Sequence, residues 1–363
     1  MAGRRRVAVA MSGGVDSSVA AALLLGRGYD VTGLSMRLWQ ERSNGSGELD
    51  GLSAARLVCR HLGIPHRVVD LRQEFLREVV DYFVSEYARG RTPNPCLRCN
   101  RIIKFGLLRE HARQLECDFL ATGHYARIQR VGAAHRLLRG ADSGKDQSYV
   151  LYALREHQLT SLLFPLGNHT KAQVRTMARA RTLPAADRPE SQDVCFLRDN
   201  DYRRFLAERL PGAIRPGPIY DLHGRQLGEH RGLPFYTVGQ REGLGILGPR
   251  PLYVKSLDLA RNALVVGFAE ELGRDGLIAA EMSYVSDQEL PGASAVEAKI
   301  RYRARPVPAR VWPLTGRRAR VLFQSPLRDI TPGQAVVLYR GDWLLGGGII
   351  SQAIDRVPHT GYK

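Results

Sequence analysis

One short stretch between an apolar run and an alanine- and leucine-rich run carries the clearest chemistry in the chain. It spans Ser12 to Ser18 with the sequence SGGVDSS, and the preceding Val7 to Met11 predicts a buried parallel strand. Two adjacent glycines permit a positive φ and a close approach by a ligand, so backbone N–H groups can form an anion-binding nest at a helix N-terminus. Ser12 and Ser17 add hydroxyl donors, and Asp16 supplies an oxygen ligand for the magnesium that accompanies a nucleoside triphosphate. The stretch therefore predicts a phosphate cradle.

From the residues alone, the same stretch is also compatible with a tight turn followed by a capped helix, since serine and aspartate are favoured N-caps. It lacks the lysine of the Walker loop and the spacing of the dinucleotide fingerprint. The full string SGGVDSS resembles the PP-loop of the ATP pyrophosphatase superfamily. Members of that superfamily transfer AMP to an oxygen atom of the substrate and release pyrophosphate.

Three of the five cysteines lie in polar stretches. Cys96 and Cys99 belong to TPNPCLRCN, and Cys195 belongs to RPESQDVCF. Two prolines exclude helix around Cys96, so we expect it in a constrained loop, with Cys99 at the start of a helix among basic residues, which favours the thiolate. Taken alone, the CxxC pair indicates a redox pair, a metal half-site or packing, and Cys195 indicates packing. Cys59 and Cys117 are predicted to be buried packing residues.

Composition limits the classes of partner. The 363-residue chain carries 53 Lys and Arg against 36 Asp and Glu, a net charge of +17. This excess favours a polyanionic partner, with nucleic acid the leading candidate. The odd number of cysteines predicts reduced thiols rather than a disulfide scaffold. No apolar segment approaches the roughly 20 residues of a membrane span, and residues 1–11 lack a signal-peptide pattern, so we expect a cytoplasmic protein without a membrane partner.

The order of the expected elements predicts an α/β fold with β-rich domains after it. Strands and helices alternate up to about residue 200, which predicts a doubly wound parallel sheet with ligands at the carboxyl ends of its strands. Within it we expect an amphipathic helix over 73–89. Beyond it, Gly- and Pro-rich turns separate short strands. We therefore expect a nucleotide-binding domain over 1–200, a small β-rich domain over 201–276 and a C-terminal β-barrel over 277–363.

Several further positions are candidates for function. Met36 lies near the end of the second expected strand, and Gly123 and His124 follow a later strand. The polar cluster 145–147 precedes an expected helix, and the stretch 301–305, RYRAR, interleaves basic and aromatic residues as in surfaces that follow a phosphate backbone. The ordinary alternatives are a core methionine, a surface histidine, a solvated helix cap and an exposed strand face.

Seven motifs in one order extend the superfamily resemblance to a family. They are SGGVDSS, TPNPCLRCNRIIKF, ATGHYARI, KDQSYVL, the Cys195 segment, YTVGQREGLGI and PGQAVVLYRGDWLLGGG. With these motifs, the chain resembles the bacterial tRNA-uridine 2-sulfurtransferases, or tRNA 2-thiouridylases, from Val7 to about Ile350. Any one motif is weak evidence, whereas seven in sequence are highly specific.

The resemblance implies 2-thiolation of the wobble uridine in tRNAs for lysine, glutamate and glutamine. In this family ATP, with Mg²⁺ on its triphosphate, adenylates O2 of the uracil, which turns that oxygen into a good leaving group. A persulfide on the residue matching Cys195 then attacks C2, and the thiol matching Cys99 completes sulfur release. The products are 2-thiouridine, AMP and pyrophosphate, with a Cys99–Cys195 disulfide as by-product. The sulfur donor, a cysteine desulfurase or a small relay protein, stays open.

The resemblance also assigns binding residues by motif. The positions that match ATP-binding residues are Ala10, Met11, Ser12, Gly13, Gly14, Val15, Asp16, Ser17, Met36 and Gly123. The positions that match residues around the flipped base or elsewhere on the tRNA are Asn94, Pro95, Cys96, His124, Lys145, Asp146, Gln147, Arg301, Tyr302 and Gln334. A base must leave its stack to reach such a pocket.

One departure from the family pattern keeps two routes open. Some members carry an aspartate with an acid/base role where this chain has Cys96, so that role is absent here. Instead, Cys96, Cys99 and Cys195 could provide three thiolate ligands for a 4Fe-4S cluster with one open iron. Both the persulfide route and the cluster route are therefore expectations. The cysteines argue against PP-loop enzymes with amine nucleophiles, such as GMP, NAD and lysidine synthetases, and against a non-catalytic RNA-binding protein.

Overall fold

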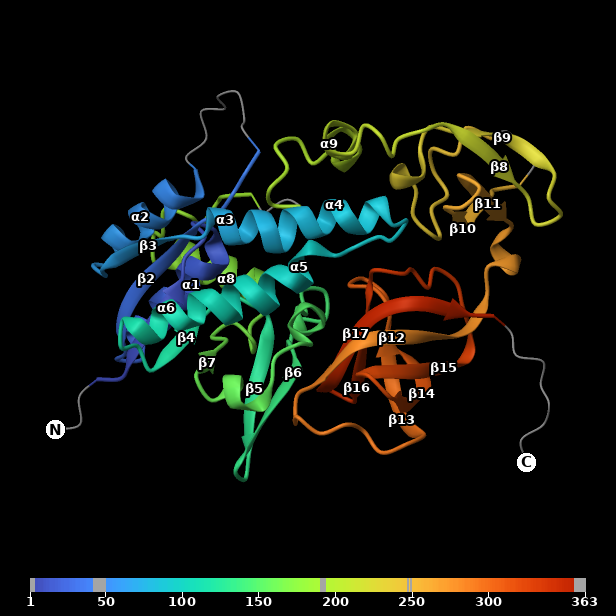
Figure 1. The fold of residues 1–363 in the computed structure, drawn as a ribbon. Helices are drawn as coiled ribbons and strands as arrows, with labels where there is room; N and C mark the ends of the chain where they lie inside the picture. Colours follow the sequence, from blue (N-terminus) through green and yellow to red (C-terminus); the bar gives the residue numbers. More distant parts are fainter. Residues whose placement is uncertain (1–3, 42–49, 190–193, 247, 249, 356–363) are drawn as a thin grey trace.

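The computed structural model describes residues 4–41, 50–189, 194–246, 248 and 250–355. Its N-terminal part is built on a five-stranded parallel sheet with the strand order β3-β2-β1-β4-β7 (Figure 1). The strands are β1 (Arg6–Ala10), β2 (Asp30–Arg37), β3 (His66–Asp70), β4 (Phe119–Ala121) and β7 (Leu162–Leu163). This confirms the predicted doubly wound parallel sheet, and the order of its strands reverses between β1 and β4.

Helices cover both faces of the sheet because its central strand is apolar on both sides. Val7 and Val9 of β1 pack in one core with helices that follow β1, β2 and β7, whereas Ala8 packs in a second core with Phe105 and Leu108. The helices of the first face are α1 (Val15–Gly26), α2 (Gly51–His61) and α8 (Lys171–Ala180). Successive side chains of a strand point to opposite faces, so β1 is buried from both sides.

Two helical runs carry the chain to and past the CxxC pair. The first run confirms the helix predicted over 73–89, and six residues separate it from the second run. The runs are α3 (Arg72–Phe75), η1 (Leu76–Val80) and α4 (Asp81–Ala88), followed by α5 (Pro95–Arg98), η2 (Cys99–Leu108) and α6 (Arg109–Gln114). Both η1 and η2 are π-helical, a geometry that is rare and often found at functional sites.

A β-hairpin of the N-terminal part joins the C-terminal barrel. The hairpin consists of β5 (Ala126–Val131) and β6 (Ala134–Arg139), and Leu138 of β6 pairs with Trp343 of β17. The barrel itself closes because β12 pairs with both β15 and β17. The remaining short helices before the central sheet are η3 (Ser148–Leu151), α7 (Glu156–Leu159) and α9 (Tyr202–Arg209).

Two antiparallel-rich sheets form the rest of the molecule, as predicted. The central sheet has the order β10-β11-β8-β9, and the barrel has the order β12-β15-β14-β13-β16-β17. The central elements are β8 (Gly217–Tyr220), β9 (Gln226–His230), η4 (Leu233–Phe235), β10 (Tyr253–Asp258), β11 (Ala263–Gly267) and η5 (Ala269–Glu271). The barrel strands are β12 (Arg274–Tyr284), β13 (Ser294–Lys299), β14 (Val307–Leu314), β15 (Arg318–Leu327), β16 (Ala335–Arg340) and β17 (Trp343–Ile354).

The tight contact between β2 and α2 gives a first prediction. Gly33 is buried in β2, and a Cβ there would overlap the Cys59 sulfur, whereas a Cβ at Gly26 would meet open space. Gly33→Ala should lower the free energy of unfolding by about 1–3 kcal/mol, because overpacking displaces the thiol. Gly26→Ala should change it by less than about 1 kcal/mol. Urea unfolding measures both, and equal effects of the two substitutions would contradict the packing described.

Candidate functional site

The glycines of the predicted cradle have different tasks. Gly13 adopts a left-handed φ of +78°, and a Cβ there would lie 2.8 Å from the Cβ of Ala54 in α2. Gly14 has a β-region conformation, and the nearest atom to a Cβ there is the Ser12 hydroxyl at 3.5 Å. Gly13 is therefore required by the turn and by α2, whereas Gly14 keeps the side of the cradle that faces a ligand open.

The first turn of α1 has no side-chain cap. Gly14 is the N-cap residue, and no side chain accepts a hydrogen bond from the first-turn amides. The Ser17 hydroxyl instead donates to the Gly14 carbonyl (3.1 Å) and lies 3.3 Å from the Ser12 hydroxyl. The capped-turn alternative is thus wrong, and the uncapped N–H groups at the positive end of the helix favour an anion.

Basic and phenolic groups from distant parts of the chain surround Asp16. Lys171, the first residue of α8, forms an ion pair with its carboxylate at 2.8 Å, and the Tyr125 hydroxyl donates to it at 2.8 Å. The Arg188 guanidinium donates to the carbonyl of Gly13 at 3.3 Å. Two cations at the mouth of the cradle suit a triphosphate. Asp16 remains an oxygen donor for magnesium, and that role stays a prediction.

Sequence reasoning did not identify these groups. Lys171 lies far from Asp16 along the chain, and a lysine at the start of a helix is ordinarily unfavourable to the helix dipole. The available signal was the capping box of Thr170 and Gln173, which fixes where α8 begins and therefore where Lys171 points. Nothing in the sequence connects that helix start to the cradle.

The other predicted ATP-binding positions divide into packing and open positions. Met11 and Val15 bury their side chains in the sheet core, and Ala10 and Met36 are half-buried. The Met11 amide donates to the Leu34 carbonyl, and its carbonyl accepts from the Ser35 hydroxyl. A Cβ at Gly123 would lie 2.8–2.9 Å from the backbone of Asp16 and Ser17. The glycine is therefore explained by the close approach of the β4 end to α1, and its contact with a nucleotide stays a prediction.

His124 is a buried, neutral imidazole, so the surface-histidine alternative is wrong. Its Nδ1 lies 2.7 Å from the Thr122 hydroxyl, and its ring lies 5.7 Å from Phe105 and 6.0 Å from Phe164. Burial, and secondarily the nearby Lys104 ammonium, hold the pKa of His124 well below its usual range. At neutral pH it offers one donor and one acceptor without charge.

The structure corrects the prediction for the CxxC pair. Helix begins at Pro95, because a proline at the first helical position loses no hydrogen bond, and the Asn94 side chain caps the helix by accepting from the Cys96 amide at 3.0 Å. Cys96 is therefore exposed in the first turn of a helix rather than in a loop. Cys99 lies one turn farther on, at the first position of the π-helical stretch, and is not at a helix N-terminus.

The expectation that Cys99 is a ready thiolate is also wrong. Cys99 is buried in an apolar cluster with Phe75, Phe196 and Ile103. Burial raises the pKa of its thiol to about 12, with smaller contributions from the Cys195 and Cys96 thiols. Desolvation likewise raises the pKa of Cys195 to about 11, although that residue is exposed at its surface. Both groups are thiols at neutral pH.

The three cysteines nevertheless gather at one place. The Cys96 and Cys195 thiols lie near enough to Cys99 to affect its pKa, and the Lys104 ammonium lies near enough to both Cys99 and Cys195 to favour their thiolates. All three are free thiols. Among the described residues, no three His, Cys, Asp or Glu side chains converge as in a metal site, so this arrangement does not fit the ligand set of a 4Fe-4S cluster.

Cys59 and Cys117 have the predicted packing environment. Cys59 is buried in the core between β2 and α2, and burial raises the pKa of its thiol to about 11. Cys117 is half-buried before β4, and burial raises its pKa as well. Neither contributes to the pKa shifts of Cys99 and Cys195.

The cluster 145–147 shapes the backbone around Tyr125. Asp146 is buried and accepts from the amides of Gly140 and Ser148 and from the Ser148 hydroxyl, each at 3.0 Å. The Gln147 side chain accepts from the Tyr125 amide at 3.0 Å. Lys145 is half-buried. The solvated-cap alternative is therefore wrong for Asp146, and contact of the three with tRNA stays a prediction.

Two of the predicted tRNA-contacting residues of the barrel hold the three domains together. Gln334 donates to the Thr92 carbonyl at 2.9 Å, just before the CxxC helix. Arg301 donates to the Val238 carbonyl at 2.8 Å and to the Thr331 hydroxyl at 2.6 Å. Arg301 lies outside the strands and at a domain contact, so the exposed-strand alternative given for 301–305 is wrong for it.

Tyr302, a further residue predicted to contact tRNA, packs within the protein. Its ring is half-buried and faces the ring of Tyr149 at 6.1 Å, edge on.

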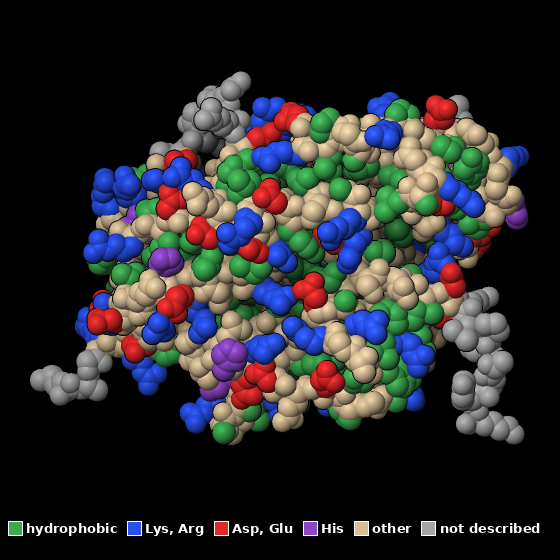
Figure 2. Space-filling view, in the orientation of Figure 1, with side chains coloured by type: hydrophobic (Ala, Val, Ile, Leu, Met, Phe, Trp, Pro, Cys, Tyr) green, Lys and Arg blue, Asp and Glu red, His purple; other side chains and the backbone are tan. Residues whose placement is uncertain are grey.

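Figure 2 shows Lys and Arg side chains spread over the whole visible face and interspersed with Asp and Glu. Within the described part of the chain, every helix falls short of a membrane span in length or in apolar character.

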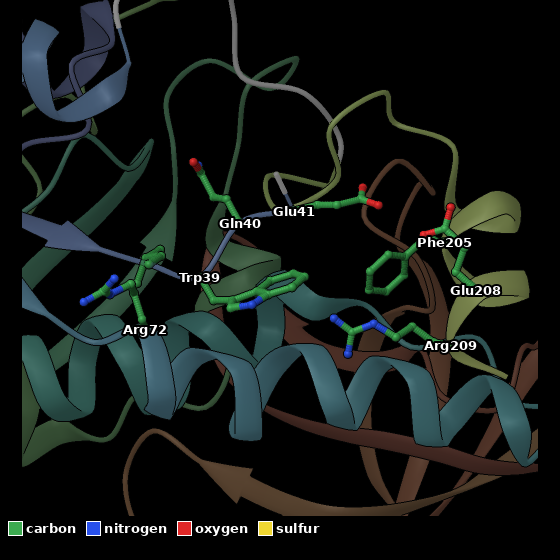
Figure 3. A pocket seen from close by; sticks show the side chains of 8 residues that line it. Trp39, Gln40, Glu41, Arg72, Phe205, Glu208 and Arg209 are labelled. Atoms are coloured by element: carbon green, nitrogen blue, oxygen red, sulfur yellow. The ribbon is translucent and has the colours of Figure 1, made fainter. Parts of the chain in front are cut away.

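A cavity of about 530 Å³ lies where the chain leaves β2 (Figure 3). Its walls come from the segment after β2, from the start of α3 and from α9. The lining side chains are Leu38, Trp39, Gln40, Glu41, Arg72, Phe205, Glu208 and Arg209. It borders the Cys195 segment, since the Trp39 ring lies 6.4 Å from that of Phe196.

Three family models match successive parts of the chain. Residues 5–199 match a tRNA methyl transferase HUP domain, residues 203–268 a tRNA methyl transferase PRC-barrel domain, and residues 274–350 an aminomethyltransferase beta-barrel domain. Together they account for nearly the whole chain. The first match contains the cradle, His124 and all five cysteines.

Curated relatives match over almost their full length. The tRNA-specific 2-thiouridylase MnmA of Moorella thermoacetica is 50% identical, over 94% of this chain and 98% of the relative. The protein of the same name from Carboxydothermus hydrogenoformans is 49% identical, over 97% of this chain and 99% of the relative. A solved structure, the U34-tRNA thiolase NcsA from Methanococcus maripaludis with its [4Fe-4S] cluster, is 22% identical over 57% of this chain and 67% of that one, at a TM-score of 0.32. A likeness that weak supports no inference about this site.

The Lys171–Asp16 pair gives a second prediction. Lys171→Met should weaken ATP binding about tenfold or more, because a charge-assisted contact at the cradle is lost. Arg179→Met removes the same charge from the far end of α8, where the arginine pairs with exposed Asp187, and should change the affinity less than about twofold. Titration calorimetry with ATP measures both, and equal effects would mean that Lys171 acts only through net charge.

Proposed function

The chain belongs to the tRNA-specific 2-thiouridylase family, and on that premise we propose that it thiolates C2 of the wobble uridine in tRNAs for lysine, glutamate and glutamine. One observation carries the proposal: the chain just after β4 packs against the cradle, and there His124 shares the neighbour Lys104 with Cys99 and Cys195. Gly123 packs against the first turn of α1, His124 follows it directly, and Lys104 lies near His124, Cys99 and Cys195. Gly123, His124 and Lys104 therefore connect the anion site with the cysteine group.

The first half of the reaction uses the cradle. ATP placed on the first turn of α1, between Lys171 and Arg188, presents its α-phosphate to O2 of the uracil, which attacks it and releases pyrophosphate. N3 of the uracil loses its proton in this step, and O2 becomes part of AMP, a good leaving group. Magnesium held by Asp16 would neutralise the triphosphate. The net charge of +17 supports binding of the tRNA, from which the base must be flipped out.

The second half uses the thiols. A persulfide on Cys195, loaded by a cysteine desulfurase or a relay protein, attacks C2 through its outer sulfur, and AMP leaves. The Cys99 sulfur then attacks the Cys195 Sγ, which breaks the bond to the outer sulfur and forms the Cys99–Cys195 disulfide. The proton that Cys99 gives up balances the one that N3 regains in 2-thiouridine. A thiol reductant afterwards returns both cysteines to the free thiols found in the structure.

Substitution of Cys99 tests this proposal. Cys99→Ser should bind tRNA as the wild type does but lose single-turnover thiolation by about a thousandfold or more, since it removes a reacting atom. Cys117→Ser, at a half-buried thiol away from the site, should thiolate normally. Mass spectrometry of digested tRNA measures 2-thiouridine in both. Thiolation that survives Cys99→Ser would remove the proposed role of Cys99.

Metal analysis of anaerobically purified protein separates the two sulfur routes. Iron-free protein that thiolates tRNA from a persulfide donor supports the thiol route. A near-stoichiometric iron–sulfur cluster that disappears together with activity in Cys96→Ala would replace that route with a cluster held by Cys96, Cys99 and Cys195.

A further inference from the structure

A single carboxylate ties the Cys195 segment to the end of β2. Glu41 accepts from both Nη atoms of Arg204, at 2.6 and 2.7 Å, and from the Arg198 amide at 3.2 Å. Its own amide donates to the Phe196 carbonyl at 3.1 Å. The two-pronged arginine–carboxylate contact fixes orientation as well as distance. Glu41 therefore contacts the residues that directly follow Cys195 through both its side chain and its backbone.

Arg204 extends this contact to α9. Besides Glu41 it donates to Asp199 at 2.7 Å, in the segment after Cys195, and to Glu208 at 2.9 Å, one turn along its own helix. The side chains of Glu41 and Arg204 are only 12% and 21% exposed, so solvent screens their attraction less than that of a surface pair. The arginine lowers the pKa of Glu41 and the pKa of Asp199, the latter to about 2, so both carboxylates are charged at neutral pH.

Aromatic packing anchors the Cys195 segment at Phe196. The Phe196 ring lies 5.4 Å from that of Phe83 and 5.8 Å from that of Phe205, in a buried aromatic cluster. Beside the cavity of about 530 Å³ (Figure 3), the Trp39 ring lies 6.3 Å from that of Phe205 and 5.1 Å from the Arg209 guanidinium of α9. The Glu41–Arg204 ion pair adds a charged link between the end of β2 and α9 there.

We propose that Glu41 and Arg204 are positioning residues that hold Cys195 within reach of Cys99. The proposal rests on the sulfur transfer proposed above, in which the Cys99 sulfur must attack Cys195. Phe196 fixes the depth of the segment, and the ion pair fixes its orientation. Without the pair, the Glu41 amide and the Trp39 ring still hold the segment at Phe196, but its orientation is less fixed and the two sulfurs meet less often.

Disulfide formation between the two cysteines tests the positioning without tRNA or ATP. Oxidised glutathione takes up both electrons and both protons as two glutathione thiols, and labelling of the remaining protein thiols gives the rate of Cys99–Cys195 bond formation. Glu41→Gln, which keeps the shape of the side chain but removes its charge, should slow this rate about tenfold. The single-turnover thiolation rate should fall by the same factor, while the affinities for ATP and tRNA stay within about twofold.

The matched control is Glu208→Gln. Glu208 also pairs with Arg204, from the same helix, and reaches the Cys195 segment through a long contact of 3.9 Å with Arg198, so both rates should stay within about twofold of the wild type. If Glu41→Gln fails to fold, Arg204→Lys, which keeps the charge but loses the fork, takes its place with the same expectation.

The outcomes are distinct for the positioning role and for the proposed function. Disulfide formation at the wild-type rate in a folded Glu41→Gln variant overturns the positioning role, whatever the activity. An equal loss in Glu208→Gln overturns it too, because the effect would then belong to the whole ion-pair network. Slower disulfide formation in Glu41→Gln alone supports it, even if the wild type fails to thiolate tRNA and the proposed function itself fails.

Discussion

The uncapped first turn of α1 is the constraint on which the rest of the site depends. Its amides have no side-chain acceptor, which leaves them to solvent or to an anionic ligand at the positive end of the helix. The fold keeps this position open by using glycine three times: Gly13 makes room for α2, Gly14 leaves the mouth clear, and Gly123 lets the end of β4 lie against the turn. Lys171 and Arg188, which lie far downstream in the sequence, supply positive charge at this position.

The surroundings of the cysteine thiols disfavour a negative charge, whereas the cradle favours one. Burial in an aromatic and aliphatic cluster raises the pKa of Cys99, and desolvation raises the pKa of Cys195, which lies at the surface, so both cysteines favour the thiol form. Lys104 opposes this effect at both cysteines, and it also lies near the neutral His124. The site therefore combines a polar anion cradle with an apolar environment around Cys99.

The sequence was informative where local patterns decide structure. The alternation of apolar strands and helices predicted the parallel sheet, and SGGVDSS predicted the cradle, because both depend on neighbouring residues. The loop predicted for Cys96 was wrong because proline is compatible with the first position of a helix, and Asn94 supplies the cap there. The thiolate predicted for Cys99 was wrong because the basic residues nearby in sequence do not show how deeply the sulfur is buried.

Long-range contacts were outside the reach of such patterns. No periodicity connects Lys171 to Asp16, Gln334 to Thr92 or Glu41 to Arg204, since each pair meets only through the tertiary fold. The hairpin β5–β6 also joins a barrel whose other strands lie more than 130 residues later. Arg301 and Gln334 were expected to contact the tRNA. In the structure, their side chains donate hydrogen bonds across contacts between domains.

The most direct test of the account asks whether the cradle activates the uridine before any sulfur arrives. Protein with no sulfur donor is mixed with unmodified tRNA and ATP labelled in its α-phosphate, and the label on the tRNA and the pyrophosphate released are followed together. The account predicts that one AMP becomes attached to the wobble uridine for each pyrophosphate released. Release of pyrophosphate without label on the tRNA, or label on the protein instead, would contradict it.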